Sequence, residues 1–278
     1  MQNLVTLLRQ IYLLEVVGGV AVVCLGWVSC RLTGSPWVRS APLWLGGYLL
    51  VYNLDRLHFD PADQFNTPVR FRNRKSLRGK RLILIWLSAI ALISWPALTG
   101  RWWLVPSLAL VIGVLQFYSR PLPLVQRRLK DVPVLKTFIA PFFIASILVL
   151  WPVLEMGRTL SPRDGLVFFW CFLVLCVNSV SFDLRDIRGD LKTGTRTVTV
   201  LLGANGSIVF LGVLGLLAVL TSAMLGLSGV ADVFLPGSLL LGIGLLLGAL
   251  FYHAQPTLFT LLADLFLCLP ACALLIAR

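Results

Sequence analysis

The chain has 278 residues, of which 58% are hydrophobic and only 13% are charged. A soluble domain carries about 25% charged residues, so this composition excludes an ordinary water-soluble globular protein. The formal net charge is +12, but the basic residues lie in short segments between apolar stretches. Because they are not placed on a separate soluble module, nucleic acid is not an expected partner.

Nine apolar stretches follow one another along the chain, each near the length that a helix needs to cross a bilayer. They are too long for barrel strands and lack the alternating pattern of such strands, so they predict helices. We therefore expect an all-α, polytopic membrane protein with about nine transmembrane helices, forming a single domain over residues 1–278. The expected spans are 11–32, 38–55, 82–99, 102–118, 136–154, 164–182, 205–227, 233–252 and 257–276.

The basic residues gather in three of the connecting segments. Residues 56–81 contain eight, residues 120–136 contain five and residues 185–196 contain four, which is 17 of the 24 in the chain. With nine spans, all three segments lie on the same side of the membrane as the N-terminus. The positive-inside rule places this side in the cytoplasm. We expect a bacterial inner-membrane protein in contact with membrane lipids, with a polar cap on its cytoplasmic side.

The densest polar stretch begins where the sixth span ends. Asp183, Asp186 and Asp190 are spaced i, i+3 and i+7, so they share one face if the helix continues. Carboxylates so close repel one another unless a cation lies among them, and Mg²⁺ often binds one or two carboxylates together with substrate phosphates. Arg188 and Lys192 follow closely and suit phosphate oxygens. The stretch predicts a catalytic Mg²⁺ site beside a phosphate-bearing substrate.

A second polar group ends the second span. Asn53 and Asp55 are candidate catalytic and metal-binding residues there, and Arg56 is a candidate diphosphate contact. A helix cap beside an interfacial arginine would give the same pattern, so both interpretations remain open.

The stretch from Asp183 to Gly203 resembles the second aspartate-rich motif and its tail in the UbiA-type intramembrane prenyltransferases. The expected helix count, the chain length and the position after the sixth span agree with that family over the whole chain. The resemblance implies that an isoprenyl diphosphate binds through Mg²⁺ between two aspartate-rich motifs and is ionised there. The prenyl cation is then joined to a lipophilic acceptor. The resemblance also implies that Asp183, Asp186 and Asp190 form the second metal site.

The first motif differs from that of the family. Where the family has roughly Asn-Asp-x-x-Asp-x-x-x-Asp, this sequence has Leu54, Leu57 and Pro61 at the three acid positions after Asn53. Asp55 with Asn53 remains a candidate for binding one Mg²⁺. The departure is compatible with a divergent substrate, altered chemistry or loss of catalysis.

The family also has a tyrosine with basic residues after its fourth helix. In that region this sequence has Tyr118, Arg120, Lys130 and Lys136, which the resemblance makes candidates for binding the diphosphate. The lysine that the family often has four residues after the tyrosine is absent from this sequence.

Two alternatives to a prenyltransferase remain at this point. A terpene cyclase of the same type would ionise the prenyl diphosphate and let the cation attack its own chain. A transporter or non-catalytic membrane protein would use acids within the spans, and Glu15 and Asp264 are such acids. Matched broken helices in two halves, which are typical of transporters, are not evident in the sequence.

Overall fold

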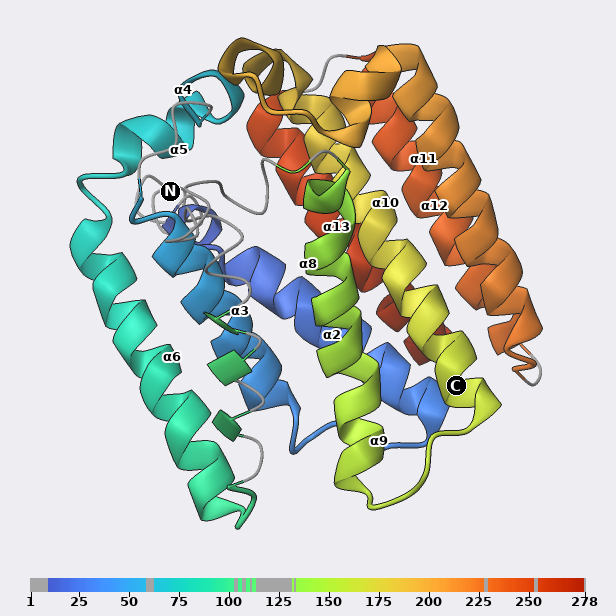
Figure 1. Ribbon diagram of the computed structural model, residues 1–278. Helices are drawn as coiled ribbons and strands as arrows, with labels where there is room; N and C mark the ends of the chain where they lie inside the picture. Colours follow the sequence, from blue (N-terminus) through green and yellow to red (C-terminus); the bar gives the residue numbers. More distant parts are fainter. Residues whose placement is uncertain are drawn as a thin grey trace.

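The structure is a computed structural model that describes residues 10–58, 63–102, 105–106, 109–110, 112–113, 132, 134–227, 230–252 and 255–277. Its regular secondary structure is helical (Figure 1). The helices are α2 (Val16–Thr33), α3 (Ala41–Asp55), α4 (Asp63–Asn66), α5 (Pro68–Asn73), α6 (Arg78–Leu98), α8 (Leu135–Ala145), the π-helical turn η2 (Ser146–Leu150), α9 (Trp151–Glu155), α10 (Pro162–Thr193), α11 (Val198–Met224), α12 (Ala231–Phe251) and α13 (Pro256–Ile276).

The predicted bundle of apolar helices is confirmed, whereas the count of nine spans is not. Seven described segments are long and apolar enough to cross a membrane: α2, α6, residues 137–155 (α8, η2 and α9 together), α10, α11, α12 and α13. Helix α3 packs against both α2 and α6 but has only 15 residues. Most of the span expected at 102–118 lies outside the described residues.

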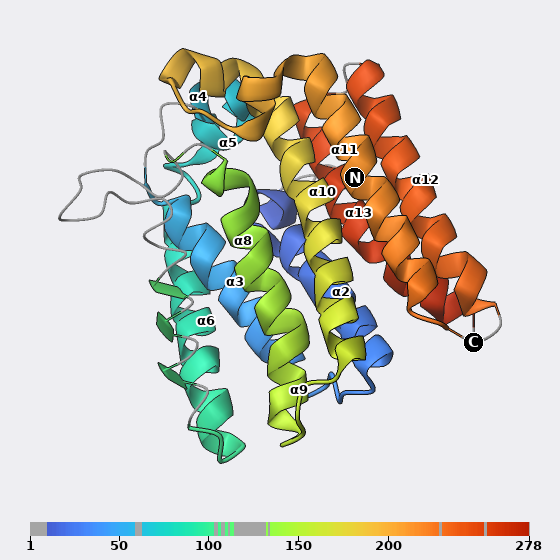
Figure 2. The same cartoon turned by 45° about the vertical axis from the view of Figure 1, so that its right-hand side comes forward.

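The helix ends gather at two opposite faces of the bundle (Figures 1 and 2). We call one of them the site face; it holds α4, α5, the start of α2, the end of α3, the start of α6, the end of α10 and the start of α13. At the opposite face, ion pairs between Glu155 and Arg101 and between Arg158 and Asp164 connect neighbouring segments. Arg158 also donates a hydrogen bond to the Thr33 carbonyl at 3.1 Å. The described parts of the basic segments 56–81 and 185–196 lie together at the site face, as their charge predicted.

Helix α10 runs through the middle of the bundle. It begins at a capping box in which Ser161 and Asp164 exchange hydrogen bonds, and it ends at Gly194, which has a φ of 74°. Its 32 residues span about 48 Å. Because the hydrocarbon layer is only about 30 Å thick, the last turns of α10 project toward the membrane surface at the site face.

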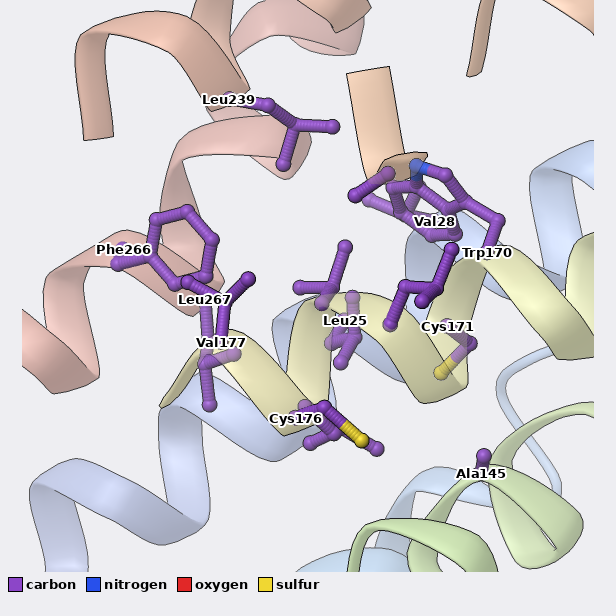
Figure 3. Close-up of a cluster of buried hydrophobic side chains, with 14 of the residues drawn as sticks. Leu25, Val28, Ala145, Trp170, Cys171, Cys176, Val177, Leu239, Phe266 and Leu267 are labelled. Atoms are coloured by element: carbon purple, nitrogen blue, oxygen red, sulfur yellow. The ribbon is translucent and has the colours of Figure 1, made fainter. Parts of the chain in front are cut away.

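The core forms where α10 packs against α2, η2, α11 and α13. Trp170, Cys171 and Val177 of α10 are completely buried among residues such as Leu25 of α2 and Phe266 of α13 (Figure 3). Helix α11 changes direction near its start, at Gly203, which has φ 68° and ψ 177°. This backbone conformation is accessible essentially only to glycine.

Glycine also permits close packing between α12 and α13. A Cβ atom at Gly242 would lie 2.4 Å from Cδ2 of Phe266, whereas no atom of the described residues lies within 4 Å of one at Gly244. Small residues let membrane helices approach closely, so Gly242 sets the distance between these two helices.

We expect Gly242→Ala to destabilise the protein by about 1–3 kcal/mol, the usual cost of overpacking a buried contact. The matched variant Gly244→Ala adds the same methyl group to the same helix at an open position. It should leave stability unchanged or raise it slightly, because alanine favours helix more than glycine does. Thermal unfolding in detergent measures both, and equal effects of the two variants would contradict the proposed packing.

Candidate active site

The first membrane helix is interrupted at the site face. Residues 10–13 form a helical turn, Leu14 and Glu15 form a turn, and α2 begins at Val16. Glu15 has a φ of 64°, a left-handed conformation that is uncommon for residues other than glycine. The break frees two backbone carbonyls: that of Leu14 accepts from Nδ2 of Asn53 at 3.1 Å, and that of Leu13 accepts from Nη2 of Arg81 at 3.4 Å.

The Glu15 carboxylate joins two arginines from separate elements. Its Oε1 lies 3.2 Å from Nε of Arg56, which follows α3, and 3.2 Å from Nη1 of Arg70 in α5. Arg56 also pairs with Asp63 at 3.3 Å. Burial lowers the pKa of the Arg56 guanidinium, but the Asp63 and Glu15 carboxylates outweigh burial and hold this pKa well above its ordinary value. Arg56 therefore stays charged in the network.

A small pocket opens beside this network, and four of its lining residues are arginines. The arginine pocket, as we call it, is lined by Arg56, His58, Asp63, Arg70, Phe71, Arg74 and Arg81. Arg81 is only 1% exposed, and its Nη1 donates to the Arg56 carbonyl at 3.1 Å. Arg70 is 7% exposed and its guanidinium lies 4.7 Å from the centre of the Tyr12 ring. These contacts hold two of the guanidinium groups rigidly at the pocket.

The aspartates of the predicted second motif lie on the last turns of α10. The helix continues to Thr193, so Asp183, Asp186 and Asp190 keep the helical spacing that places them along one face. Oδ2 of Asp183 accepts from the Thr137 hydroxyl at 2.9 Å. Both oxygens of Asp186 accept from the guanidinium of its neighbour Arg185, each at 2.7 Å. Asp183 and Asp190 are buried, whereas Asp186 is partly exposed.

Helix α4 joins the two halves of the site, because it packs against the end of α10. Gly189 makes this approach possible: a Cβ atom there would lie 2.0 Å from Oδ1 of Asn66. Nζ of Lys192 lies 4.3 Å from the centre of the Phe65 ring, also in α4. The fold therefore brings α4, in the segment after α3, next to the end of α10 that carries the three aspartates.

The described residues contain no group of three or more His, Cys, Asp or Glu side chains placed to hold a metal ion. Asn53, a predicted ligand, is fully buried, and its Nδ2 donates to the carbonyls of Leu14 and Leu49. Its buried Oδ1 has no hydrogen-bond partner among the described residues. Among the described residues the donor set fits a Mg²⁺ ion that takes one or two carboxylates of α10 and completes its shell with oxygens from elsewhere, and it does not fit a cage built by these residues alone.

The other predicted residues fall into two groups. Asp55 ends α3, while Arg188 and Lys192 are exposed on the last turns of α10. Tyr118, Arg120 and Lys130 lie outside the described residues; Lys136 belongs to α8, but its side chain is not described. The diphosphate-binding roles predicted for Tyr118, Arg120, Lys130 and Lys136 therefore stay predictions.

Sequence reasoning missed the part of the site made by Arg70, Arg74 and Arg81. All three were counted only as topology signals. Glu15 was recognised as an acid within a span, without its partners. A charge inside an apolar span implies a counter-charge, and that signal pointed toward the arginines of the following basic segment.

No protein-family model and no curated protein matches the chain. Its structure is similar to the apo structure of a UbiA homolog from Aeropyrum pernix K1, with a TM-score of 0.66 and 13% sequence identity over 93% of this chain and 97% of that one. The seven described segments that are long and apolar enough to cross a membrane identify the chain as a polytopic integral membrane protein. Its fold is the UbiA-type fold, which confirms the prediction made from the sequence.

We expect Glu15→Gln to lower stability by about 3 kcal/mol, because Arg70 and Arg56 would lose a carboxylate in a buried setting. Thermal unfolding in detergent measures the loss. Asp232→Asn is the matched control, since Asp232 is an exposed acid at the start of α12. Equal melting temperatures of the two variants would show that Glu15 does not organise the site face.

Gly189→Ala should push α4 away from α10, because the added methyl group overlaps the Asn66 amide. Overpacking of this kind costs about 1–3 kcal/mol. Gly165→Ala is the matched control in the same helix, at a position where no atom of the described residues lies within 4 Å of the new Cβ. Limited proteolysis of the segment around α4 should accelerate in Gly189→Ala alone; unchanged cleavage would contradict the contact.

Proposed function

We propose that this protein is a UbiA-type enzyme of the bacterial inner membrane that moves an isoprenyl group from a prenyl diphosphate to a lipophilic acceptor within the membrane. The observation that carries the proposal is the meeting of the arginine pocket and the aspartates of α10, through α4, at one end of a UbiA-type bundle. The site face would be cytoplasmic, where the diphosphate is available.

A prenyl diphosphate has a charged end and an apolar end, and the site offers a charged environment and an apolar environment to match them. The diphosphate would lie between the arginines and the end of α10, with Arg188 and Lys192 near its outer oxygens. Next to Thr137 in the sequence begins an aromatic cluster in which neighbouring ring centroids lie 5.7–6.5 Å apart. It consists of Phe138 and Phe142 on α8 and Phe168 and Phe172 on α10. This cluster offers an apolar surface for the prenyl chain.

The reaction breaks the bond between the first prenyl carbon and a diphosphate oxygen. The diphosphate leaves with the electron pair, and the allylic cation is captured by the acceptor, which forms the new bond and loses a proton. Arg and Lys side chains stabilise the negative charge that develops on the leaving group. Asp186, or its neighbours Asp183 and Asp190, would hold Mg²⁺, which would supply further neutralisation of that charge. The surrounding helices and lipid exclude water, which would otherwise quench the cation.

Asp186→Ala should reduce diphosphate release at least about 100-fold, the usual effect of removing a group that acts on transition-state charge. The measurement uses purified protein in nanodiscs with Mg²⁺, a mixture of quinone-precursor acceptors, and geranyl, farnesyl or geranylgeranyl diphosphate. Asp232→Ala should retain full activity, and EDTA should abolish release by the parent protein. Full activity of Asp186→Ala, in protein with an unchanged melting temperature, would overturn the mechanism.

The lipid product of the same assay identifies the reaction type. A prenylated acceptor supports the transferase. A cyclic hydrocarbon formed without an acceptor would replace it with the terpene cyclase that shares the ionisation step.

A further inference from the structure

The arginine pocket retains hydrogen-bonding capacity that the protein itself does not use. Arg70 and Arg81, which are 7% and 1% exposed, each have a buried Nε with no hydrogen-bond partner among the described residues. A buried donor without an acceptor costs about 1–3 kcal/mol, so a ligand that offered acceptors to these two donors would be favoured at this site. The missing partner is an acceptor, because an arginine side chain only donates.

Positive charge exceeds negative charge among the residues that line this pocket. Four guanidinium groups line it with one carboxylate, that of Asp63, whereas the carboxylates of Glu15, Asp55 and Asp264 interact with Arg56 or Arg70 from outside the lining. Two of these carboxylates are occupied: Glu15 pairs with two arginines, and Asp63 pairs with Arg56. A polyvalent anion suits the remaining charge better than a metal cation does.

We propose that the arginine pocket binds the phosphoryl groups of the diphosphate directly, without a metal ion, in the place where a first aspartate-rich motif would hold Mg²⁺. Leucines and a proline occupy the acid positions of that motif in this sequence, and the neighbouring Asn53 amide holds the broken first helix. The identification of the anion as a prenyl diphosphate rests on the proposed function; the preference for a phosphoryl anion rests on the pocket alone.

Guanidinium groups suit this ligand for two reasons. Each presents parallel N–H donors that match two phosphate oxygens, and each remains protonated at any physiological pH. The phosphate of an anionic lipid headgroup has the same chemistry at the same membrane depth, so the test has to separate the two sources.

The experiment measures binding of inorganic pyrophosphate to the full-length protein in phosphatidylcholine nanodiscs containing EDTA, by isothermal titration calorimetry. Arg74 is the residue to change, because it lines the pocket but is only partly buried and is not one of the two arginines paired with Glu15. Arg72→Gln is the matched control, since Arg72 lies two residues earlier in the last turn of α5, is exposed and is not among the lining residues. Arg74→Lys tests whether charge alone suffices.

We expect saturable binding in EDTA that Arg74→Gln weakens about tenfold or more, as the loss of a charged hydrogen bond predicts. Arg72→Gln should stay within about twofold of the parent, and Arg74→Lys should fall between the two. Binding that appears only with Mg²⁺, or equal weakening by the Arg74 and Arg72 glutamine variants, would overturn the proposal.

Nanodiscs containing phosphatidylglycerol separate the two sources. The affinity of the parent protein for pyrophosphate should be only modestly lower in these nanodiscs than in phosphatidylcholine. A large decrease in the parent protein that is absent in Arg74→Gln would show that lipid phosphate occupies the pocket, and it would overturn the diphosphate assignment. Pyrophosphate binding without release from any prenyl diphosphate would contradict the proposed function and leave the anion site intact. Turnover of a prenyl diphosphate, combined with pyrophosphate binding that strictly requires Mg²⁺, would support the proposed function and contradict the metal-free anion site.

Discussion

The site face depends on the break in the first membrane helix at Leu14 and Glu15. Backbone carbonyls freed at membrane depth must find donors, because lipid offers none. Here Asn53 and Arg81 provide them, and the Glu15 carboxylate binds Arg56 and Arg70. A single local interruption therefore fixes the positions of α3, α5 and α6 relative to α2, and it places a set of guanidinium groups around one pocket.

The other half of the site is organised by the length of α10. This helix is about 48 Å long, so its last turns carry Asp183, Asp186 and Asp190 beyond the apolar core to the level of the arginine pocket. Helix α4 then fits against Gly189 and joins the acidic side to the basic side. The proposed ligand, which bears phosphates and would recruit a divalent cation, has a charge distribution that matches this combination.

Much of the fold was predictable because each apolar stretch specifies its own helix. The sequence interpretation ended the sixth span at residue 182 and left open whether the helix continues through Asp190, which it does in α10. The arginine pocket was not predictable, because Glu15 and Arg70 are 55 positions apart and only the folded bundle brings them together. The helix break lacks the glycine or proline that usually marks one, so the sequence interpretation treated residues 11–32 as continuous and did not foresee that Nδ2 of Asn53 donates to the Leu14 carbonyl.

Arginines and a metal ion neutralise a diphosphate by different means, and the difference explains the acids that remain near the pocket. A metal site needs carboxylates that are empty until the ion arrives, whereas clustered guanidinium groups repel one another permanently because they do not deprotonate. Glu15 and Asp63 reduce that repulsion in the free protein. A bound diphosphate would add to these internal counter-charges rather than replace them, because the Nε donors of Arg70 and Arg81 are still unfilled when the ion pairs are formed. On this proposal the positive charge is already in place before the anion arrives, and Mg²⁺ would act only on the α10 side.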